Sequence, residues 1–300
     1  MRTLLVLWIA GWAGLAAAAP LRVCATVPDL GDLVQRVGGD EVAVTVFAKG
    51  GEDPHFVEAK PGFIRALSQA DLFVEVGLEL EVGWAPVLLK NARNVRVQPG
   101  QPGYLDASRA ITPKDVPQGA VDRSMGDVHA AGNPHYLLDP ENGRAVAALI
   151  RDRLIALRPT GEAGFRERQA ALDRELAALT ARAQADLAAA RGRKVVVDHN
   201  LWPYFAERFG LVVAAHLEPK PGLPPTTRHL GEVVERMRAE QIGLILTSPY
   251  FDARHARFVS ERTGARVVAL AHQVGARPGT DSYPALIAYN VDQLKAALAP

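Results

Sequence analysis

The sequence has little of several features that would point to a particular class of protein. It contains one cysteine, so no internal disulfide can form. It has almost no excess charge, since 34 Lys and Arg residues against 33 Asp and Glu residues give a net charge of +1. Binding to nucleic acid needs clustered positive charge, which excludes nucleic acid as the main partner. We therefore expect a small ligand or a protein partner.

Compact functional motifs are also lacking. The chain has no CxxC pair, no HExxH segment and no GxxxxGK[ST] phosphate-binding loop. Any ATPase that works with this protein must therefore be another chain. Apolar residues at 48% and charged residues at 22% are normal for a globular protein, and 300 residues suffice for two domains.

The one long apolar run covers residues 4–19. It follows Arg2, finishes in small residues that satisfy an A-x-A cleavage pattern, and stops at Pro20. A helix that crosses a bilayer needs about 20 apolar residues, so this run is short for one. We interpret residues 1–19 as a secretory signal peptide, cleaved after Ala18 or Ala19, and the alternative is an uncleaved membrane anchor.

The only cysteine, Cys24, follows this segment. A lipoprotein signal prefers a small residue before the modified cysteine, and here that residue is Val23. Apolar residues alternate around Cys24, which predicts a buried first strand. We therefore expect Cys24 to lie in the core.

After residue 20, short β-type runs alternate with helical patterns, which is typical of an α/β fold with mainly parallel sheets. We predict helices at 29–37, 61–69 and from Pro140 onward, behind the capping residue Asp139. We divide the chain into an N-terminal α/β lobe (20–158), a long helix (159–191) and a C-terminal α/β lobe (192–300). The strands are predicted at 21–26, 42–48, 72–76, 95–97, 194–198, 211–217, 242–248 and 266–270.

The segment 160–191 differs from the rest of the chain. It has no interior proline and is rich in Ala, Leu, Glu and Arg, which favour helix. At 1.5 Å per residue, about 30 residues make a rod of roughly 45 Å. A coiled coil is the alternative, but the pattern lasts for too few heptads. We expect a rigid helix along both lobes, with an apolar stripe of Phe165, Leu172, Leu176, Leu179 and Leu187.

Three histidines occur in similar local contexts. His55 follows a predicted strand in GGEDPH, His135 precedes a helix in GNPHYLLDP, and His199 directly follows the strand KVVVD. In open α/β sheets the loops at the carboxyl ends of the strands line the ligand crevice. Imidazole is the commonest transition-metal ligand near neutral pH. Asp281, in the loop after the last strand, would complete a four-coordinate set that suits zinc, with manganese as the second candidate.

The spacing of these four residues does not by itself identify a metal site. They lie far apart in the sequence, and an isolated histidine is more often a surface or hydrogen-bonded residue than a ligand. From the residues alone, metal binding and a structural role both stay open.

Five ordered segments resemble the zinc/manganese class of solute-binding proteins of ABC transporters (cluster A-I). They are GGEDPHFVEAKPG, ALSQADLFVEVGLELE, GDVHAAGNPHYLLDPENG, VVVDHNLWPYFAERFGL and GTDSYPALIAYNVDQL. The resemblance extends from Leu21 to the C-terminus. It implies two lobes joined by one long helix, with a metal ion buried between them.

Carried over by position, the family's ligands fall on His55, His135, His199 and Asp281. Many zinc-dedicated members carry a histidine-rich loop before the second ligand, whereas this chain has only His129 there. Asp53 and Glu58 flank His55 and could orient its ring. We expect Asp198 to be structural, Trp202 and Tyr204 to pack beneath the third ligand, and the remaining histidines to be surface or helix-end residues (His216, His229, His255 and His272).

The resemblance implies a protein that captures a divalent metal in the periplasm and delivers it to a permease in the inner membrane. We expect zinc as the cargo, manganese as the runner-up, no enzymatic activity, and a monomer. A periplasmic metallochaperone is a second candidate partner. Two other classes are weighed: a secreted zinc hydrolase, which four protein ligands disfavour because they leave no position for water, and a surface adhesin.

Overall fold

The computed structural model describes residues 19–119, 121 and 125–299. The signal peptide predicted at residues 1–19 falls almost wholly outside this part. In the described part, no helix combines the length and the apolar character needed to cross a membrane.

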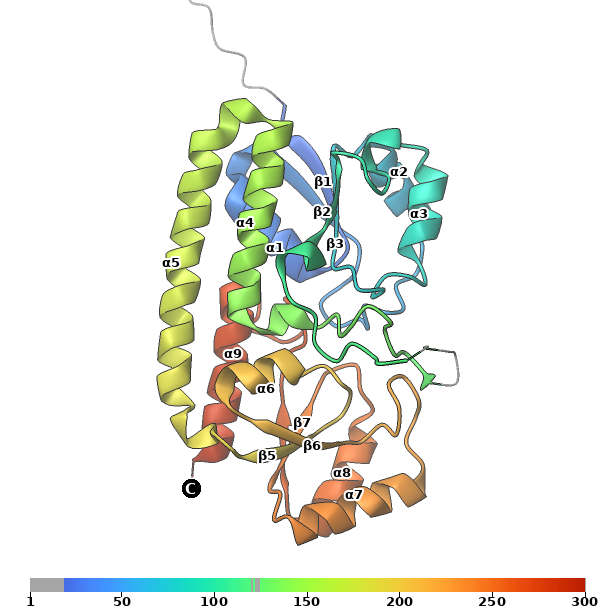
Figure 1. Cartoon of the computed structure of the whole chain (residues 1–300), viewed down its shortest axis with the longest axis vertical. Helices are drawn as coiled ribbons and strands as arrows, with labels where there is room; N and C mark the ends of the chain where they lie inside the picture. Colours follow the sequence, from blue (N-terminus) through green and yellow to red (C-terminus); the bar gives the residue numbers. More distant parts are fainter. Residues whose placement is uncertain (1–18, 120, 122–124, 300) are drawn as a thin grey trace, which may run out of the picture.

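Two four-stranded parallel sheets form the centres of two lobes (Figure 1). The strands of the N-terminal lobe have the order β2-β1-β3-β4, with bounds β1 Leu21–Ala25, β2 Val42–Val46, β3 Leu72–Glu75 and β4 Tyr104–Asp106. Those of the C-terminal lobe have the order β6-β5-β7-β8, with bounds β5 Lys194–Val197, β6 Val212–His216, β7 Leu244–Thr247 and β8 Arg266–Ala269. The two lobes therefore share one strand order, and the predicted α/β class is confirmed.

Helices cover the sheets in both lobes. Several begin with proline at a first helical position, where the missing N–H has no partner to lose. The N-terminal lobe has α1 Pro28–Gly38, α2 Pro61–Gln69, α3 Ala85–Ala92 and α4 Pro140–Leu157. The C-terminal lobe has α6 Pro203–Phe209, α7 Thr227–Ala239, α8 Ala253–Thr263 and α9 Tyr283–Leu298.

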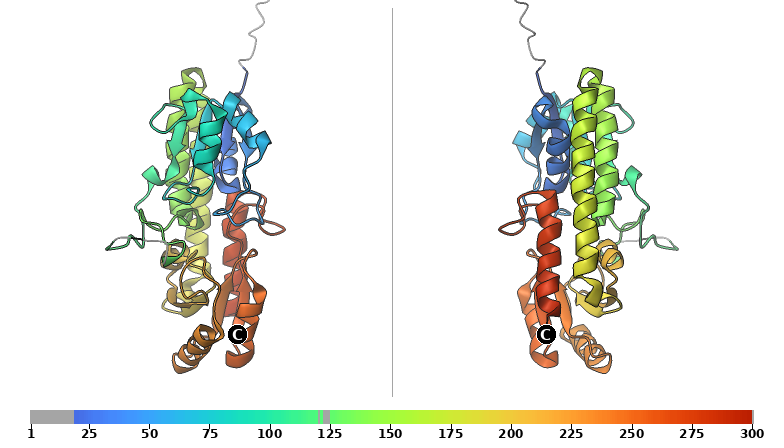
Figure 2. Two further views of the ribbon diagram at one scale, coloured as in Figure 1. Left: turned by 90° about the vertical axis from the view of Figure 1, so that its right-hand side faces the viewer. Right: turned by 90° about the vertical axis from the view of Figure 1, so that its left-hand side faces the viewer.

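The predicted long helix is α5, Glu162–Asp186, which runs beside both lobes (Figures 1 and 2). It packs against α1 and α4 of the first lobe and α9 of the second. All five residues of the predicted apolar stripe are buried in one hydrophobic core that also includes residues of both sheets. Because α5 pairs with helices of its own chain, the described structure uses its apolar stripe for connecting the lobes and not for a coiled coil.

One predicted strand is wrong. Residues Val95–Val97 form a short 3₁₀ helix, and the edge strand of the sheet is β4, Tyr104–Asp106. The side chain of Asn94 caps this turn by accepting a hydrogen bond from the N–H of Arg96. Valines at 95 and 97 have high strand propensity, but local capping at Asn94 directs this segment into a turn.

Cys24 lies in β1, between Thr45 of β2 and Phe73 of β3. Its side chain is buried, and burial raises the pKa of the thiol to about 12. The prediction of a core cysteine is confirmed.

Candidate metal centre

Three buried imidazoles meet between the lobes. His55 lies in the loop between β2 and α2, His135 directly precedes the short 3₁₀ helix Tyr136–Leu138, and His199 lies two residues beyond β5. Each offers one ring nitrogen, and these nitrogens all lie within 4.8 Å of one another. The three ring centroids are 5.2 to 5.6 Å apart. The structure therefore brings together three of the four residues that the sequence predicted as ligands.

The ring of His55 is oriented by Asp53. Its Nδ1 lies 2.7 Å from Oδ1 of Asp53, and the same oxygen accepts a hydrogen bond from the backbone N–H of His55. A carboxylate can only accept, so Nδ1 carries the proton and Nε2 keeps its lone pair. Burial is the largest single influence on Asp53 and would raise its pKa, but the hydrogen bonds from His55 and the positive charge of His55 and His199 together lower the pKa below its usual value. Asp53 thus stays ionised and holds His55 ready to bind a cation through Nε2.

The ring of His199 is oriented in the same way by Glu218. Nδ1 of His199 lies 2.6 Å from Oε2 of Glu218, and both side chains are buried. Burial is the largest single influence on His199 and would lower its pKa, but the hydrogen bond with Glu218 and the negative charges of Glu218, Asp198 and Asp53 together raise the pKa above its usual value. The free nitrogen is again Nε2.

The third imidazole has an unsatisfied nitrogen. Nε2 of His135 is buried and has no hydrogen-bond partner. Burial and the neighbouring imidazoles hold the pKa of His135 well below its usual value, so the ring is neutral. A buried polar atom without a partner costs free energy, and a bound metal ion would remove that cost. The donor set and the orphaned nitrogen therefore fit a transition-metal ion.

The backbone around these rings is tied across the lobes. The side chain of Asn133 donates to the backbone oxygen of Asn200 and accepts from the N–H of His135. The Tyr204 hydroxyl donates to the backbone oxygen of Asn133. The second and third ligand segments are therefore connected by direct hydrogen bonds.

Asp281 does not lie in this group. Its side chain is exposed, at a point where the chain leaves a tight turn and enters α9. The N–H of Gly275 donates to the backbone oxygen of Thr280, which closes the turn, and Ser282 caps α9. These two local structures hold the backbone on either side of Asp281, whose carboxylate is not part of the group that the three imidazoles form.

Other predicted residues have mixed outcomes. Glu58 does not orient His55, because its side chain is exposed and lies 4.0 Å from Lys60. Asp198 is structural as expected, since Oδ2 accepts from the Ser248 hydroxyl. His272 is not a surface residue: it is buried, and its Nε2 donates to the backbone oxygen of Glu52 in the other lobe.

Glu218 was missed by the sequence analysis, although a signal for it exists. Val197 pairs with His216 in adjacent parallel strands. His199 and Glu218 therefore both lie two residues beyond the carboxyl ends of neighbouring strands. Knowing which strands are neighbours would have identified the pair.

Carboxylates surround the opening of the site. A cavity of about 230 Å³ is bordered by His55 and His199. Its lining also includes four acidic residues: Asp53, Asp127, Glu218 and Asp252. This negative lining favours the approach of a cation.

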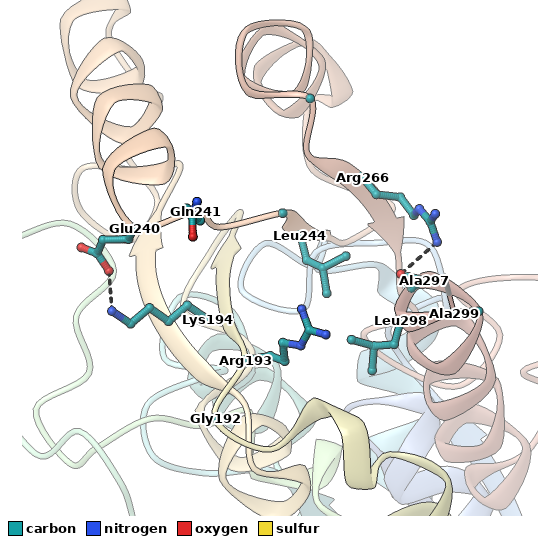
Figure 3. Close-up of a pocket in the computed structure, with 12 residues that line it drawn as sticks. Gly192, Arg193, Lys194, Glu240, Gln241, Leu244, Arg266, Ala297, Leu298 and Ala299 are labelled. Carbon is teal, nitrogen blue, oxygen red and sulfur yellow. Dashed lines mark hydrogen bonds and ion pairs between the residues drawn. The ribbon is translucent and has the colours of Figure 1, made fainter.

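A cavity of about 610 Å³ lies at the other end of the second sheet (Figure 3). It is bordered by Lys194 and Arg266, which begin β5 and β8, whereas His199 follows the carboxyl end of β5. Two of its cationic side chains have partners in the cavity wall, since Lys194 pairs with Glu240 and Arg266 donates to the backbone oxygen of Ala297. This cavity is therefore separate from the metal centre.

Comparisons with known proteins agree with this geometry. The profile of the family described as "Zinc-uptake complex component A periplasmic" matches residues 23–297. The manganese ABC transporter substrate-binding lipoprotein PsaA of Streptococcus anginosus is 25% identical, over 99% of this chain and 98% of that protein. The iron ABC transporter substrate-binding lipoprotein MtsA of Streptococcus pyogenes serotype M1 is 25% identical, over 95% of this chain and 91% of that protein.

A solved structure has the same fold. A zinc-bound deletion mutant of ZnuA superposes with a TM-score of 0.78 at 24% identity, covering 94% of this chain and 99% of that one. The relatives thus differ in the metal that their names state.

Proposed function

Because this chain belongs to the zinc-uptake complex component A family, whose members are substrate-binding proteins of metal ABC transporters, we propose that its cargo is zinc, held by His55, His135 and His199. The family consists of binding proteins and not enzymes. The hydrolase alternative is therefore set aside.

The observation that carries the choice of metal is the donor set. Three imidazole nitrogen donors converge, two of them on rings oriented by buried or half-buried carboxylates. Zinc accepts nitrogen ligands in a tetrahedral arrangement, whereas manganese prefers oxygen ligands and higher coordination. Manganese is the second candidate, because a relative of this chain is named for it.

We also propose where the protein works and with what. Residues 1–19 direct export to the periplasm, and the metal-loaded protein docks as a monomer on an inner-membrane permease driven by a separate ATPase. A periplasmic metallochaperone is a candidate source of the metal. N-terminal sequencing of protein from the periplasmic fraction should begin at Ala19 or Pro20. Intact protein that remains in the membrane fraction would contradict the export proposal.

The first experiment is elemental analysis of protein purified without added metal or an affinity tag containing histidine. We expect one zinc ion per chain. His199→Ala should abolish high-affinity binding, and His255→Ala should preserve it, because His255 lies outside the three-imidazole group. Equal effects of the two substitutions would refute the assignment of the site.

The second experiment identifies the metal used by the cell. A strain without the gene should grow poorly in the presence of a chelator, and added zinc should restore growth. Rescue by manganese and not by zinc would overturn the choice of metal and leave the binding-protein function intact.

A further inference from the structure

The C-terminal lobe holds the loop that carries the first histidine of the metal centre. Residues 272–275 follow β8, and residues 49–53 lie between β2 and His55. Nε2 of the Gln273 side chain donates to three backbone oxygens of this loop, at 2.8 to 3.2 Å: those of Lys49, Gly50 and Glu52. Gln273 is only 3% exposed, so these hydrogen bonds are shielded from water. One side chain of the second lobe therefore fixes one turn of the first.

The turn is tied both to itself and to the other lobe. A glutamine Nε2 carries two hydrogens, so with three acceptors one hydrogen is shared between two oxygens. The Glu52 oxygen also accepts from Nε2 of His272, at 3.0 Å. Within the turn, the N–H of Glu52 donates to the backbone oxygen of Lys49, at 2.9 Å. Two adjacent side chains of the C-terminal lobe thus bind the Glu52 oxygen.

The two lobes also meet backbone to backbone at this point. A Cβ atom on Gly50 would overlap the carbonyl group of Gly275 and lie 2.6 Å from the backbone oxygen of Val274. The neighbouring Gly51 differs, because a Cβ atom there would meet nothing within 4 Å. The absence of a side chain at position 50 therefore allows the 49–53 turn to approach the 272–275 segment.

This turn leads directly to the residues that form the metal centre. Asp53 follows Glu52, and its carboxylate accepts from both the N–H and Nδ1 of His55. The Glu52 oxygen and the N–H of Asp53 belong to one planar peptide unit, so holding that oxygen also fixes the start of Asp53. The direction in which His55 presents Nε2 therefore depends on where the C-terminal lobe holds the turn.

We propose that Gln273 is a positioning residue for the metal centre, which places the 49–53 turn and, through Asp53, the ring of His55. The proposal rests on the proposed function, since it concerns the same three imidazoles. It has a consequence for the whole molecule: His55 is in position only while the lobes are in contact here. Binding of the metal and association of the lobes at this contact therefore stabilise each other.

The main test is Gln273→Met in the mature, untagged protein. Methionine has nearly the size of glutamine but no hydrogen-bond donor. One net hydrogen bond changes an equilibrium constant by about 2- to 13-fold. We therefore expect Gln273→Met to weaken zinc affinity by about threefold or more, measured by competition with a chromophoric chelator. Melting of the metal-free protein checks that the variant folds.

Gln98→Met is the matched control. Nε2 of Gln98 also donates to backbone oxygens, those of Leu89 and Asn94, and neither residue belongs to a loop that carries a metal ligand. The same chemical change is thus made away from the 49–53 turn. Gln98→Met should keep wild-type zinc affinity, and an equal loss of affinity in the two variants would contradict a specific role of Gln273.

A second pair of variants disturbs the contact from the N-terminal lobe. Gly50→Ala should push the turn away from Gly275 and weaken zinc affinity, whereas Gly51→Ala should leave it unchanged. The two substitutions are identical and adjacent in the sequence. A loss of affinity in Gly50→Ala alone would therefore come from the contact between the lobes.

Hydrogen exchange separates positioning from general damage. In the metal-free protein, the amides of residues 49–56 should exchange faster in Gln273→Met and Gly50→Ala than in the wild type, while those of α5 stay unchanged. Gln98→Met and Gly51→Ala should match the wild type at residues 49–56. Wild-type zinc affinity in both Gln273→Met and Gly50→Ala, or unchanged exchange at residues 49–56 in both, would overturn the proposal.

His199→Ala serves as the reference that separates the two proposals. If His199→Ala loses zinc while Gln273→Met and Gly50→Ala keep wild-type affinity, only the positioning role of Gln273 fails. If His199→Ala also keeps wild-type affinity, the proposed metal centre itself fails, and the positioning role fails with it.

Discussion

Glu218 offers the sharpest test of how the centre is tuned. Its Oε2 accepts a hydrogen bond from Nδ1 of His199 at 2.6 Å, and also one from the N–H of Gly222 at 3.0 Å. Glu218→Gln keeps the size and an acceptor oxygen but removes the negative charge. His199 then becomes a less basic ligand, because no carboxylate stabilises positive charge on its ring.

The expected effect follows from burial. Both side chains are less than one-tenth exposed, so solvent does not screen the pair appreciably. Loss of an outer-shell partner lowers metal affinity by about 10- to 100-fold, which corresponds to about 1.4 to 2.7 kcal/mol of binding free energy. We expect this loss at pH 7.5 for Glu218→Gln.

The pH dependence should distinguish this mechanism from simple damage. In the wild type Glu218 raises the pKa of His199, so protons begin to compete with zinc at a higher pH than for an ordinary histidine. Removing the charge lowers that pKa, and competition then begins at a lower pH. The ratio of wild-type to Glu218→Gln affinity should therefore be largest at about pH 7.5 and shrink toward pH 5.5.

Calorimetric or chelator-competition titrations of zinc at several pH values measure this ratio. Glu58→Gln is the matched control, since Glu58 is exposed and its carboxylate lies near Lys60. A ratio that stays constant across this pH range would refute the argument that Glu218 acts through the proton affinity of His199.

Three further predictions can be tested with simple assays. Zinc affinity of the wild type should fall between about pH 7.5 and 5.5, because protons compete for the imidazoles, and a flat profile would indicate oxygen ligands. Gly143→Ala should lower the free energy of unfolding by about 1–3 kcal/mol in urea titrations, because its Cβ would lie 2.2 Å from the buried hydroxyl of Tyr283. A Cβ atom at Gly231 in α7 would meet no other atom, so Gly231→Ala should leave the free energy of unfolding unchanged or raise it by up to about 1 kcal/mol. Equal destabilisation by Gly143→Ala and Gly231→Ala would contradict the packing argument. Burial raises the pKa of the Cys24 thiol to about 12, so the thiol should not react with Ellman's reagent at pH 8 until guanidinium unfolds the protein. Rapid reaction of the native protein would show that Cys24 in β1 is accessible to the reagent.

Some of the metal centre could be predicted from the sequence because its signals are local. The contexts of His55, His135 and His199 place each of them beside the end of a strand or the start of a helix, and the structure brings all three together. Asp53 could be predicted as an orienting group for the same reason, since it lies two residues from His55 and forms a local turn with it. Glu58, three residues beyond His55, lies outside that turn and was predicted wrongly.

The sequence by itself determined the α/β alternation, the long helix α5 and the burial of Cys24, because hydrophobic periodicity and helix propensity act over neighbouring residues. Only the tertiary structure decided that Glu218 orients His199, that Asp281 faces solvent, and that His129 lies 3.2 Å from His55. Two of these outcomes depend on contacts between distant parts of the chain: β6 lies beside β5, and the N–H of Asp127 donates to the backbone oxygen of Pro221. The exposure of Asp281 goes with the turn that Gly275 and Thr280 close before α9. The contacts of Glu218 with His199 and of Asp127 with Pro221 join residues 19 and 94 positions apart, and no local pattern in the chain encodes their distances.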